Sequence, residues 1–229
     1  EDCIQVFRQL EENTDVDCVI ITGDGPKAFS AGADINELAA RTVAGELSTK
    51  AQLRRELPRL IETLRLPTVA AINGHCLGAG LELALACTLR IAAESAKLGL
   101  PEINLGVIPG SGGTQRLARM VGLGRAMQLA TLGEPISATE AWRIGLVNSV
   151  HPDGELIAAA RAICNKWQTK GPVSLMAARD AVLKSADVDL ASGIDYENKL
   201  FALCLASGER EEGVKAFQEK RRPRFRKRN

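Results

Sequence analysis

The stretch TVAAINGHCLGAGLELALAC, residues 68–87, contains the pattern that decides the fold class. Residues 68–73 form an apolar run that predicts a buried strand, and the run ends at Gly74. From Gly78 onward, alanine and leucine dominate and predict a helix. A buried strand therefore leads, through a glycine-rich loop, into a helix.

The same alternation of strands and helices continues on both sides of this stretch. Apolar runs predict further strands, and amphipathic spacing predicts helices. We expect strands at 17–22, 89–93, 97–100 and 146–150, and helices after Asp34 and at 46–64, 113–119, 124–132, 137–144 and 153–168. Beyond residue 172 the pattern is helical to about residue 218. The chain is therefore expected to have an α/β fold with an appended helical segment.

The composition excludes several classes of protein. With 229 residues, 45% of them hydrophobic and 25% charged, the chain can form a core and is not intrinsically disordered. Its net charge of +1 is not that of a globally basic nucleic-acid-binding protein. The two histidines and six cysteines, without a C-x-x-C pair, leave almost no ligands for a usual zinc site, and we predict no metal. No apolar run reaches the roughly 18 residues of a membrane span.

Two glycine-rich segments are candidates for binding a ligand through the backbone. Residues 29–34 read FSAGAD and residues 74–80 read GHCLGAG. Each lies between a strand and a helix, where the first N–H groups of the helix have no partner within it and carry partial positive charge. Two such groups that converge could stabilise a developing oxyanion. Tight turns without a ligand are the alternative explanation.

Two carboxylates in apolar surroundings are candidates for acid/base chemistry. Glu82 lies three residues after Ala79 on the predicted helix, and Glu102 follows Leu100-Pro101. Burial raises the pKa of a carboxyl group toward a range that is useful for proton transfer. The alternatives are structural: Glu82 could pair with Arg90 or Arg116, and Glu102 could cap a turn.

Several motifs in a fixed order resemble the enoyl-CoA hydratase/isomerase (crotonase) superfamily, and most of all its hydratases. They are FSAGADI (29–35), INGHCLGAGLELALAC (72–87), GLPEINLGVIPGSGGTQRL (99–117), ISATEAWRIGLVNSV (136–150) and GVKAFQEKRRPRF (213–225). The resemblance implies a spiral of repeated β-β-α units over residues 1–170, and a C-terminal helical trimerisation region over residues 171–229. It also implies a homotrimer or a dimer of trimers, and opening strands of the core that would precede Glu1.

The resemblance assigns catalytic roles to four residues. The backbone N–H groups of Ala33 and Ala79 would form the oxyanion hole for a thioester carbonyl. Glu82 would activate water, and Glu102 would deliver a proton to the α-carbon. The implied activity is the reversible addition of water across the 2,3 double bond of a 2-enoyl-CoA, as in the breakdown of fatty acids or related acyl-CoA compounds.

The remaining implied contacts are with coenzyme A, which is part of the substrate, so that no separate cofactor is expected. Ala31, Gly110, Phe217 and Lys220 are the predicted binding residues, the last two sometimes across a subunit boundary. The cysteines have the pattern of reduced thiols, which favours a location in the cytoplasm, or in the mitochondrial matrix if a presequence precedes Glu1.

Two alternative functions follow from other features. An isomerase would shift a double bond with Glu102 alone. An RNA-binding protein would use the basic tail at 220–228, which holds seven of the 29 basic residues, although a solvated terminus is the simpler explanation of that run.

Overall fold

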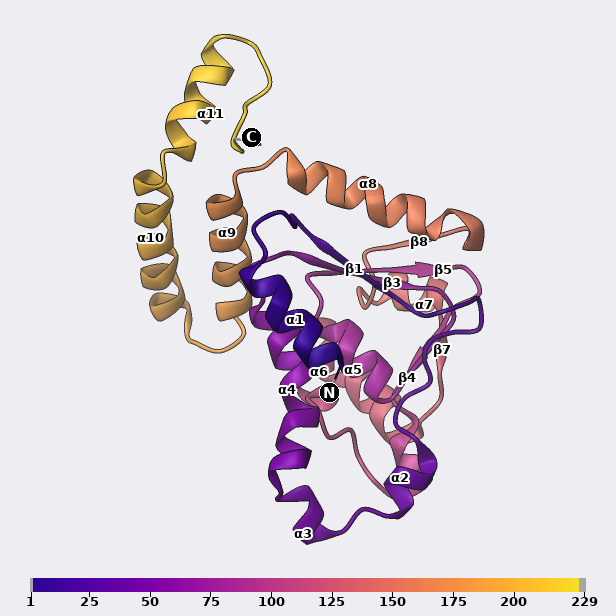
Figure 1. Ribbon diagram of the computed structural model, residues 1–229. Helices are drawn as coiled ribbons and strands as arrows, with labels where there is room; N and C mark the ends of the chain where they lie inside the picture. The colour runs from indigo at the N-terminus through magenta and orange to yellow at the C-terminus, as the bar shows by residue number, and fades with distance from the viewer. Residues whose placement is uncertain (1, 227–229) are drawn as a thin grey trace.

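The computed structural model describes residues 2–226, except for the side chains of residues 50, 53 and 54. It contains two four-stranded sheets (Figure 1). The first sheet is parallel throughout and has the order β1 (Val19–Thr22), β3 (Thr68–Ile72), β5 (Leu89–Ala93), β8 (Ser149–His151). The second has the order β2 (Ala28–Ser30), β4 (His75–Leu77), β6 (Lys97–Gly99), β7 (Ile136–Ser137), in which only the β6–β7 pair is antiparallel.

Consecutive strands alternate between the two sheets. β1, β3 and β5 belong to the first sheet, and β2, β4 and β6, which follow them in the chain, belong to the second. After β4 the chain enters α5 (Ala79–Leu85), which completes one β-β-α unit. This repetition confirms the predicted α/β spiral.

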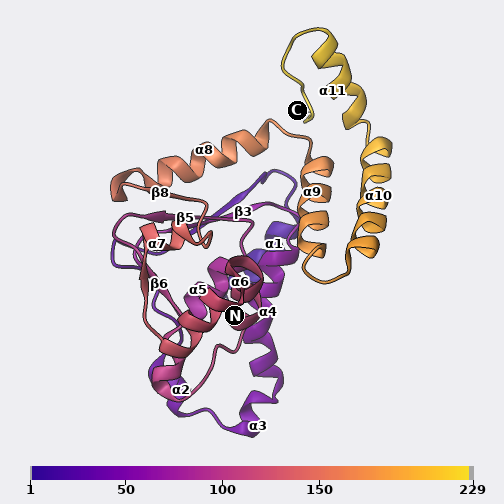
Figure 2. The same cartoon turned by 180° about the vertical axis from the view of Figure 1, so that it is seen from behind.

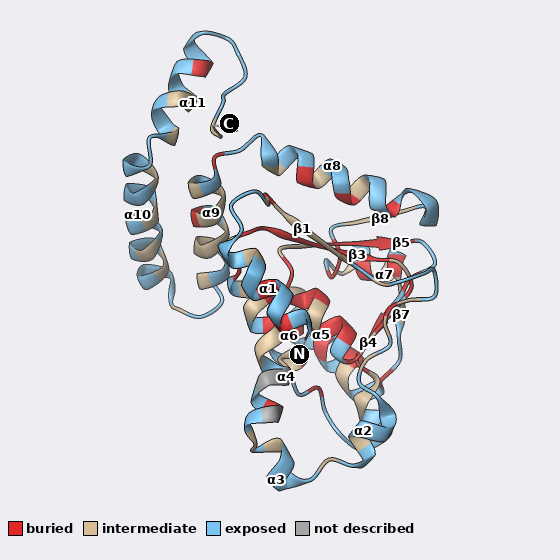
Figure 3. Cartoon of the chain, in the orientation of Figure 1, coloured by how far each residue is buried: buried red, intermediate tan, exposed pale blue. Residues whose placement is uncertain are grey.

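The core lies on both faces of the first sheet. All five residues of β3 are buried. Ala70 and Ile72 belong to the large cluster shared with α5 and the second sheet, whereas Val69 and Ala71 belong to a smaller cluster under α8 (Leu156–Gln168). Because successive side chains of a strand point to opposite faces, a strand buried on both faces must be apolar throughout. Figure 3 shows this burial concentrated on β3, β5 and α5.

The strands β2 and β4 were not expected from the sequence. Gly74 ends β3 as predicted, but the chain then forms β4 rather than a loop. β4 is held by pairing with β2 and β6, for example Cys76 opposite Leu98. Each of these strands has only three residues, which is too short for a recognisable hydrophobic period.

The two helices expected at 113–119 and 124–132 are confirmed as the two halves of α6 (Gly113–Leu132), which are separated by a kink at Gly122, where the backbone is not helical (φ +79°, ψ +162°). One helix prediction needs correction. The helix expected at 46–64 begins at Thr49 instead, as α4 (Thr49–Thr63), because the Ser48 hydroxyl accepts a hydrogen bond from Ala51 N–H and caps the helix there. A separate short helix, α3 (Val43–Glu46), precedes it. The remaining helices before residue 171 are α1 (Asp2–Glu12), α2 (Ile35–Ala39), α7 (Ala138–Arg143) and the short 3-10 helices η1 (Pro101–Leu105) and η2 (Asp153–Glu155).

Three C-terminal helices stand beside the sheets, as Figures 1 and 2 show from opposite sides: α9 (Pro172–Lys184), α10 (Leu190–Ala206) and α11 (Glu209–Gln218). α9 is tied to the core by Arg179, which donates to the carbonyl oxygen of Leu66 at 2.6 Å and also to that of Leu64. α10 contains no buried residue, and Leu190 and Phe201 are 80% and 63% exposed. The C-terminal helices therefore present apolar side chains that this chain does not cover.

Two further features are absent from the residues that the structure describes. No helix between residues 2 and 226 is long and apolar enough to cross a membrane. Over the same range, no group of three or more His, Cys, Asp or Glu side chains is arranged to hold a metal ion. Cys76 and Cys87 are buried, and burial raises the pKa of both thiols, that of Cys87 to about 12.

Candidate functional site

One cavity of about 1120 Å³ brings together most of the residues predicted from the sequence. It lies among the loop after β2, the start of α5, η1 and the loop before α6, and the segment from α2 to α4 forms its remaining wall. Six of the eight predicted site residues line it: Ala31, Ala33, Ala79, Glu82, Glu102 and Gly110.

The two loops that carry Ala33 and Ala79 lie close together at the wall of this cavity. Because β2 and β4 are paired, the loops that follow them are adjacent. A Cβ atom on Gly32, where φ is +100°, would lie 3.0 Å from the carbonyl oxygen of Leu77 and 3.7 Å from the nitrogen of Ala79. Only glycine suits this positive φ and close approach. The N–H groups of Ala33 and Ala79 have no acceptor in the part of the chain that the structure describes, and they are therefore available to a ligand.

Glu82 is buried, with 2% of the residue exposed, and its carboxylate is held by backbone donors. Its Oε1 accepts hydrogen bonds from the N–H of Ser111 at 2.7 Å and of Gly113 at 2.8 Å. Gly113 is the first residue of α6, so the partial positive charge of that helix terminus also faces the carboxylate. Among the described side chains and backbone N–H groups, none donates a hydrogen bond to Oε2 of Glu82. One oxygen is thus fixed, and the other is left for a ligand or water.

The structure does not show the ion pairs that were the structural alternative for Glu82. Arg90 donates instead to the carbonyl oxygens of Cys87 at 2.7 Å and Leu146 at 3.0 Å. Arg116 forms its ion pair with Glu62, at 2.8 Å. Neither arginine forms an ion pair with Glu82. Backbone amides hold its carboxylate instead, and Arg116 contributes only a longer-range charge interaction.

Glu102, on η1, occupies a different environment in the same cavity. Burial raises the pKa of this half-buried carboxyl group above its usual value of 4.5, and the negative charge of Glu82 adds to the effect. Its Oε2 is buried and has no hydrogen-bond partner among the described residues. Since η1 has no side-chain cap, Glu102 does not cap this turn. A carboxyl group in this setting is suited to hold and release a proton.

Gly78 places Glu102 beside the backbone donor of Ala79. Its backbone has φ +54° and ψ −125°, and a Cβ atom there would lie 3.0 Å from Oε1 of Glu102. The carboxyl group of Glu102 therefore lies against Gly78, the residue directly before the backbone donor of Ala79. The cavity therefore contains two free backbone donors and two carboxyl groups in contrasting environments.

Sequence reasoning missed the charged residues on the α2–α4 wall of the cavity, which include Arg41, Glu46 and Arg55. Arg55 Nη2 donates to Oε2 of Glu46 at 2.8 Å, and Arg41 Nε lies 3.6 Å from Oε1 of Glu46. In the sequence these side chains resemble the solvated face of an amphipathic helix. No local sequence signal distinguishes a solvated helix face from the wall of a cavity.

Phe217 and Lys220 do not line the cavity. Phe217 is on α11 and is 86% exposed, and Lys220 follows the end of that helix. Figure 1 shows α11 at the opposite end of the molecule from α2 and α3. The single chain does not bring these two residues to the site, and their contact with coenzyme A stays a prediction.

Part of the basic tail is engaged within the chain. Arg221 donates to Glu212 at 2.7 Å and to Glu219 at 2.6 Å, and Arg226 pairs with Asp17. The Arg221 guanidinium lowers the pKa of Glu212 to about 2. These contacts weaken the RNA-binding alternative, because they occupy cations that a phosphate backbone would need. Residues 227 and 228 of the tail lie outside the described residues.

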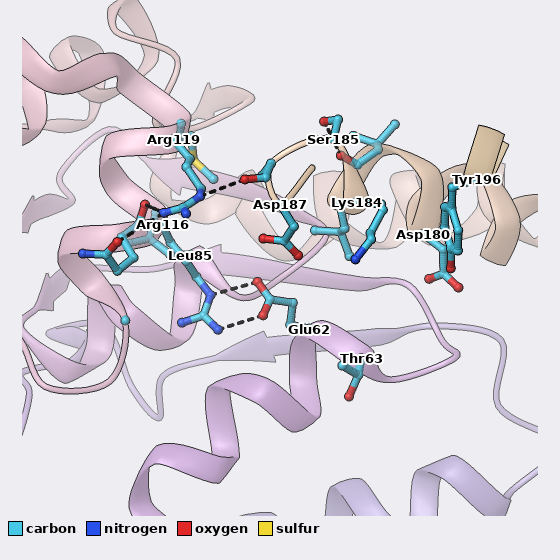
Figure 4. A pocket seen from close by; sticks show the side chains of 16 residues that line it. Glu62, Thr63, Leu85, Arg116, Arg119, Asp180, Lys184, Ser185, Asp187 and Tyr196 are labelled. Atoms are coloured by element: carbon cyan, nitrogen blue, oxygen red, sulfur yellow. Dashed lines mark hydrogen bonds and ion pairs between the residues drawn. The ribbon is translucent and has the colours of Figure 1, made fainter. Parts of the chain in front are cut away.

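A second cavity, of about 800 Å³, lies beside α6 and α9 and contains none of the predicted site residues (Figure 4). In it, Arg116 makes two hydrogen bonds to Glu62, Nε to Oε1 at 2.9 Å and Nη2 to Oε2 at 2.8 Å. Arg116 Nη1 also donates to the carbonyl oxygen of Ser111 at 3.0 Å. Arg116 therefore binds a carbonyl oxygen of the same loop whose backbone amides bind Glu82.

Comparisons with known proteins identify relatives over nearly the whole chain. The family model "Enoyl-CoA hydratase/isomerase" matches residues 1–228. The chain is 40% identical over 225 residues to 2,3-dehydroadipyl-CoA hydratase of Escherichia coli, covering 97% of this chain and 87% of the relative. It is 41% identical over 216 residues to crotonyl-CoA hydratase of Syntrophomonas wolfei, covering 94% and 83%. The crystal structure of an enoyl-CoA hydratase from Bacillus anthracis matches with a TM-score of 0.92 at 42% identity, covering 98% of this chain and 86% of that one.

Proposed function

Because the chain belongs to the enoyl-CoA hydratase/isomerase family, we propose that it is a hydratase that adds water reversibly across the 2,3 double bond of a 2-enoyl-CoA thioester. The observation that carries this proposal is the contrast between the two carboxyl groups of the cavity. Glu82 is fixed through one oxygen by two backbone amides, and the pKa of Glu102 is raised by burial. Hydration needs one group that accepts a proton from water and another that donates one to carbon.

The oxyanion hole follows from the two free backbone donors. The thioester oxygen would lie between the N–H groups of Ala33 and Ala79 and accept a hydrogen bond from each. Negative charge grows on this oxygen as water attacks C3, and preorganised donors stabilise that charge without reorganising during the reaction. The loss of one such donor costs about 2.7–4 kcal/mol in comparable acyl chemistry.

The proton balance assigns one role to each carboxyl group. Glu82 Oε2 takes a proton from the attacking water while the oxygen of that water bonds to C3. The electron pair of the double bond moves toward C2 and the thioester, and C2 then takes the proton of Glu102. The raised pKa of Glu102 keeps a larger fraction of this group protonated than an exposed glutamate would have. The reverse sequence removes water.

Loss of the ultraviolet absorbance of the conjugated thioester in crotonyl-CoA tests this assignment. Glu82→Gln and Glu102→Gln should each lower the rate at least about 100-fold, as expected for removal of a general base or acid. Glu12→Gln, on the exposed surface of α1 and outside the cavity, is the matched control and should hydrate at the wild-type rate. Wild-type turnover that survives in both active-site variants would contradict the mechanism.

A 3-enoyl-CoA separates the hydratase from the isomerase alternative. An isomerase that uses Glu102 alone would keep its activity on this substrate after Glu82→Gln, and it would not hydrate crotonyl-CoA in the wild type. The position of Glu82, held by Ser111 and Gly113, favours hydration.

We further propose that residues 171–229 form an oligomerisation region through which the chain assembles as a homotrimer or a dimer of trimers. The exposed apolar residues of the C-terminal helices, such as Leu190 and Phe201, support this proposal. In such an assembly, Phe217 and Lys220 could reach the cavity of a neighbouring chain. Light scattering of the purified protein gives the mass, and a monomer at micromolar concentration would contradict the proposal.

A further inference from the structure

The cavity has a charged wall that the proposed reaction does not use. On that wall, formed by α2 to α4, Arg41 and Arg55 stand on either side of Glu46, and Glu37 also lines the cavity. The two arginines are the cations lining this cavity within the described residues. Arg55 is bound closely to Glu46, with Nη2 at 2.8 Å from Oε2.

Arg41 is held much less closely. Its nearest contact with Glu46, Nε to Oε1 at 3.6 Å, exceeds hydrogen-bond distance, and its side chain makes no hydrogen bond to any residue in the described range. Only 28% of the Arg41 side chain is exposed. A guanidinium carries five N–H donors in a planar fork that matches a carboxylate. Arg41 therefore presents unused donors to the cavity.

Apolar side chains form much of the remaining lining of the cavity. They are Ile35 and Leu38, which belong to α2, Ile103 and Leu105, which belong to η1, and Val107, which follows η1. The methylene groups of an acyl chain suit such a surface. A chain that ends in a methyl group would leave the guanidinium unpartnered, whereas one that ends in an acceptor would pair with it.

The charge balance favours a carboxylate over a phosphate as the acceptor. Among the described side chains of this wall, the cations Arg41 and Arg55 face two carboxylates, Glu37 and Glu46. A phosphate with its larger charge would need a surplus of cations, which these described side chains do not offer. A single carboxylate needs only the one loosely held guanidinium of Arg41.

We propose that Arg41 is a specificity-determining residue that binds a carboxylate at the far end of the acyl chain. This inference rests on the proposed function, since it places the acyl group of the thioester in the same cavity. It identifies the substrate class as 2-enoyl-CoA thioesters with a terminal carboxylate.

Calorimetric binding of saturated thioesters tests the inference without turnover, because these ligands contain no double bond to hydrate. The probes are glutaryl-, adipyl- and pimelyl-CoA, each compared with the monocarboxylic acyl-CoA of the same chain length. We expect the wild type to bind at least one dicarboxylic thioester about tenfold or more tighter than its partner, as for a charge-assisted hydrogen bond. Arg41→Gln should abolish this preference and leave the affinity for the monocarboxylic series unchanged.

Two further variants control the measurement. Arg41→Lys keeps the charge and should retain part of the preference. Arg143→Gln removes a guanidinium from an exposed ion pair with Glu140 on α7, outside the cavity, and should keep all of it.

Three outcomes would overturn the inference. They are a wild type without a carboxylate preference at any length, a preference that survives Arg41→Gln, and an equal loss of affinity for both series, which would place a phosphate of coenzyme A or a structural role at Arg41. The proposed function fails separately: a wild type that shows the preference but hydrates no 2-enoyl-CoA of either series would overturn the hydratase assignment alone.

Discussion

Gly113 lies in direct contact with the carboxylate of Glu82. Its N–H donates to Oε1 at 2.8 Å, and a Cβ atom on Gly113 would stand 3.0 Å from the same oxygen. The first residue of α6 therefore binds the buried acid and also leaves the space that this acid occupies. The position of Glu82 depends on the absence of a side chain at residue 113.

Gly113→Ala should therefore lower hydration strongly. The new Cβ would lie 2.9 Å from Cβ of Pro109 as well as 3.0 Å from Oε1 of Glu82, so one of them must move. We expect kcat to fall at least about tenfold and the free energy of unfolding to fall by about 1–3 kcal/mol. The crotonyl-CoA assay and urea denaturation measure the two effects. Gly124→Ala is the control, because it lies on the same helix and a Cβ atom there would meet open space. This variant should keep full activity, and its free energy of unfolding should rise by up to about 1 kcal/mol.

Gly78→Ala should damage both stability and activity, because this backbone conformation, with ψ at −125°, lies outside the regions open to other residues. We expect backbone strain to lower the free energy of unfolding by about 1–3 kcal/mol. We also expect activity to fall, because the new methyl group would be too close to Oε1 of Glu102. Gly106 also has a positive φ, but it lies in the left-handed helical region with open space at its Cβ. Gly106→Ala should lower the free energy of unfolding by only about 1–2 kcal/mol and should keep its catalytic activity. Equal activity of the two variants would contradict the role given to the contact between Gly78 and Glu102.

Glu102→Gln should stabilise the fold at alkaline pH. Folding raises the pKa of Glu102, so the folded chain binds this proton more tightly than the unfolded chain does. Stability from this group is fully present below its usual value of 4.5 and is lost as the pH rises through the folded pKa. Glutamine cannot ionise and avoids this loss. The melting temperature of the variant should exceed that of the wild type at about pH 8, and the difference should shrink at about pH 4. A difference that is independent of pH would show that burial of the ionised form is not its cause.

Arg116→Lys should slow the reaction without weakening substrate binding. Lysine cannot reproduce the two hydrogen bonds to Glu62 together with the one to the Ser111 carbonyl. We expect kcat to fall several-fold with KM nearly unchanged, since Arg116 acts through the loop that positions Glu82. Glu62→Gln should have a similar effect, and the double variant should lose less than the product of the two single losses. Arg119→Lys, in the same cavity but bonded to Gln115 and the Ala186 carbonyl, should leave kcat unchanged.

Local patterns in the sequence were sufficient for much of the fold. The buried strand β3 and the helix α5 follow from residues 68–85 alone, because a strand covered on both faces must be apolar and a helix repeats its apolar face every three or four residues. Motif order also pointed to the crotonase family, which the comparisons confirm. The short strands β2 and β4 were missed, since three residues carry too little periodicity and are held by pairing with distant strands.

The residue types of the site were determined by the sequence, but their partners were decided by the tertiary structure. Glu82 and Glu102 could be recognised as costly carboxylates in apolar segments, and six of the eight predicted residues meet in one cavity. Glu82 is held by backbone amides 29 and 31 residues away and not by an arginine. This choice of partner depends on how the start of α6 packs against α5. The place of Arg41 in the cavity wall, and of Phe217 far from it, likewise depends on packing. Sequence patterns report interactions between near neighbours in the chain, whereas these contacts join segments that only the folded core brings together.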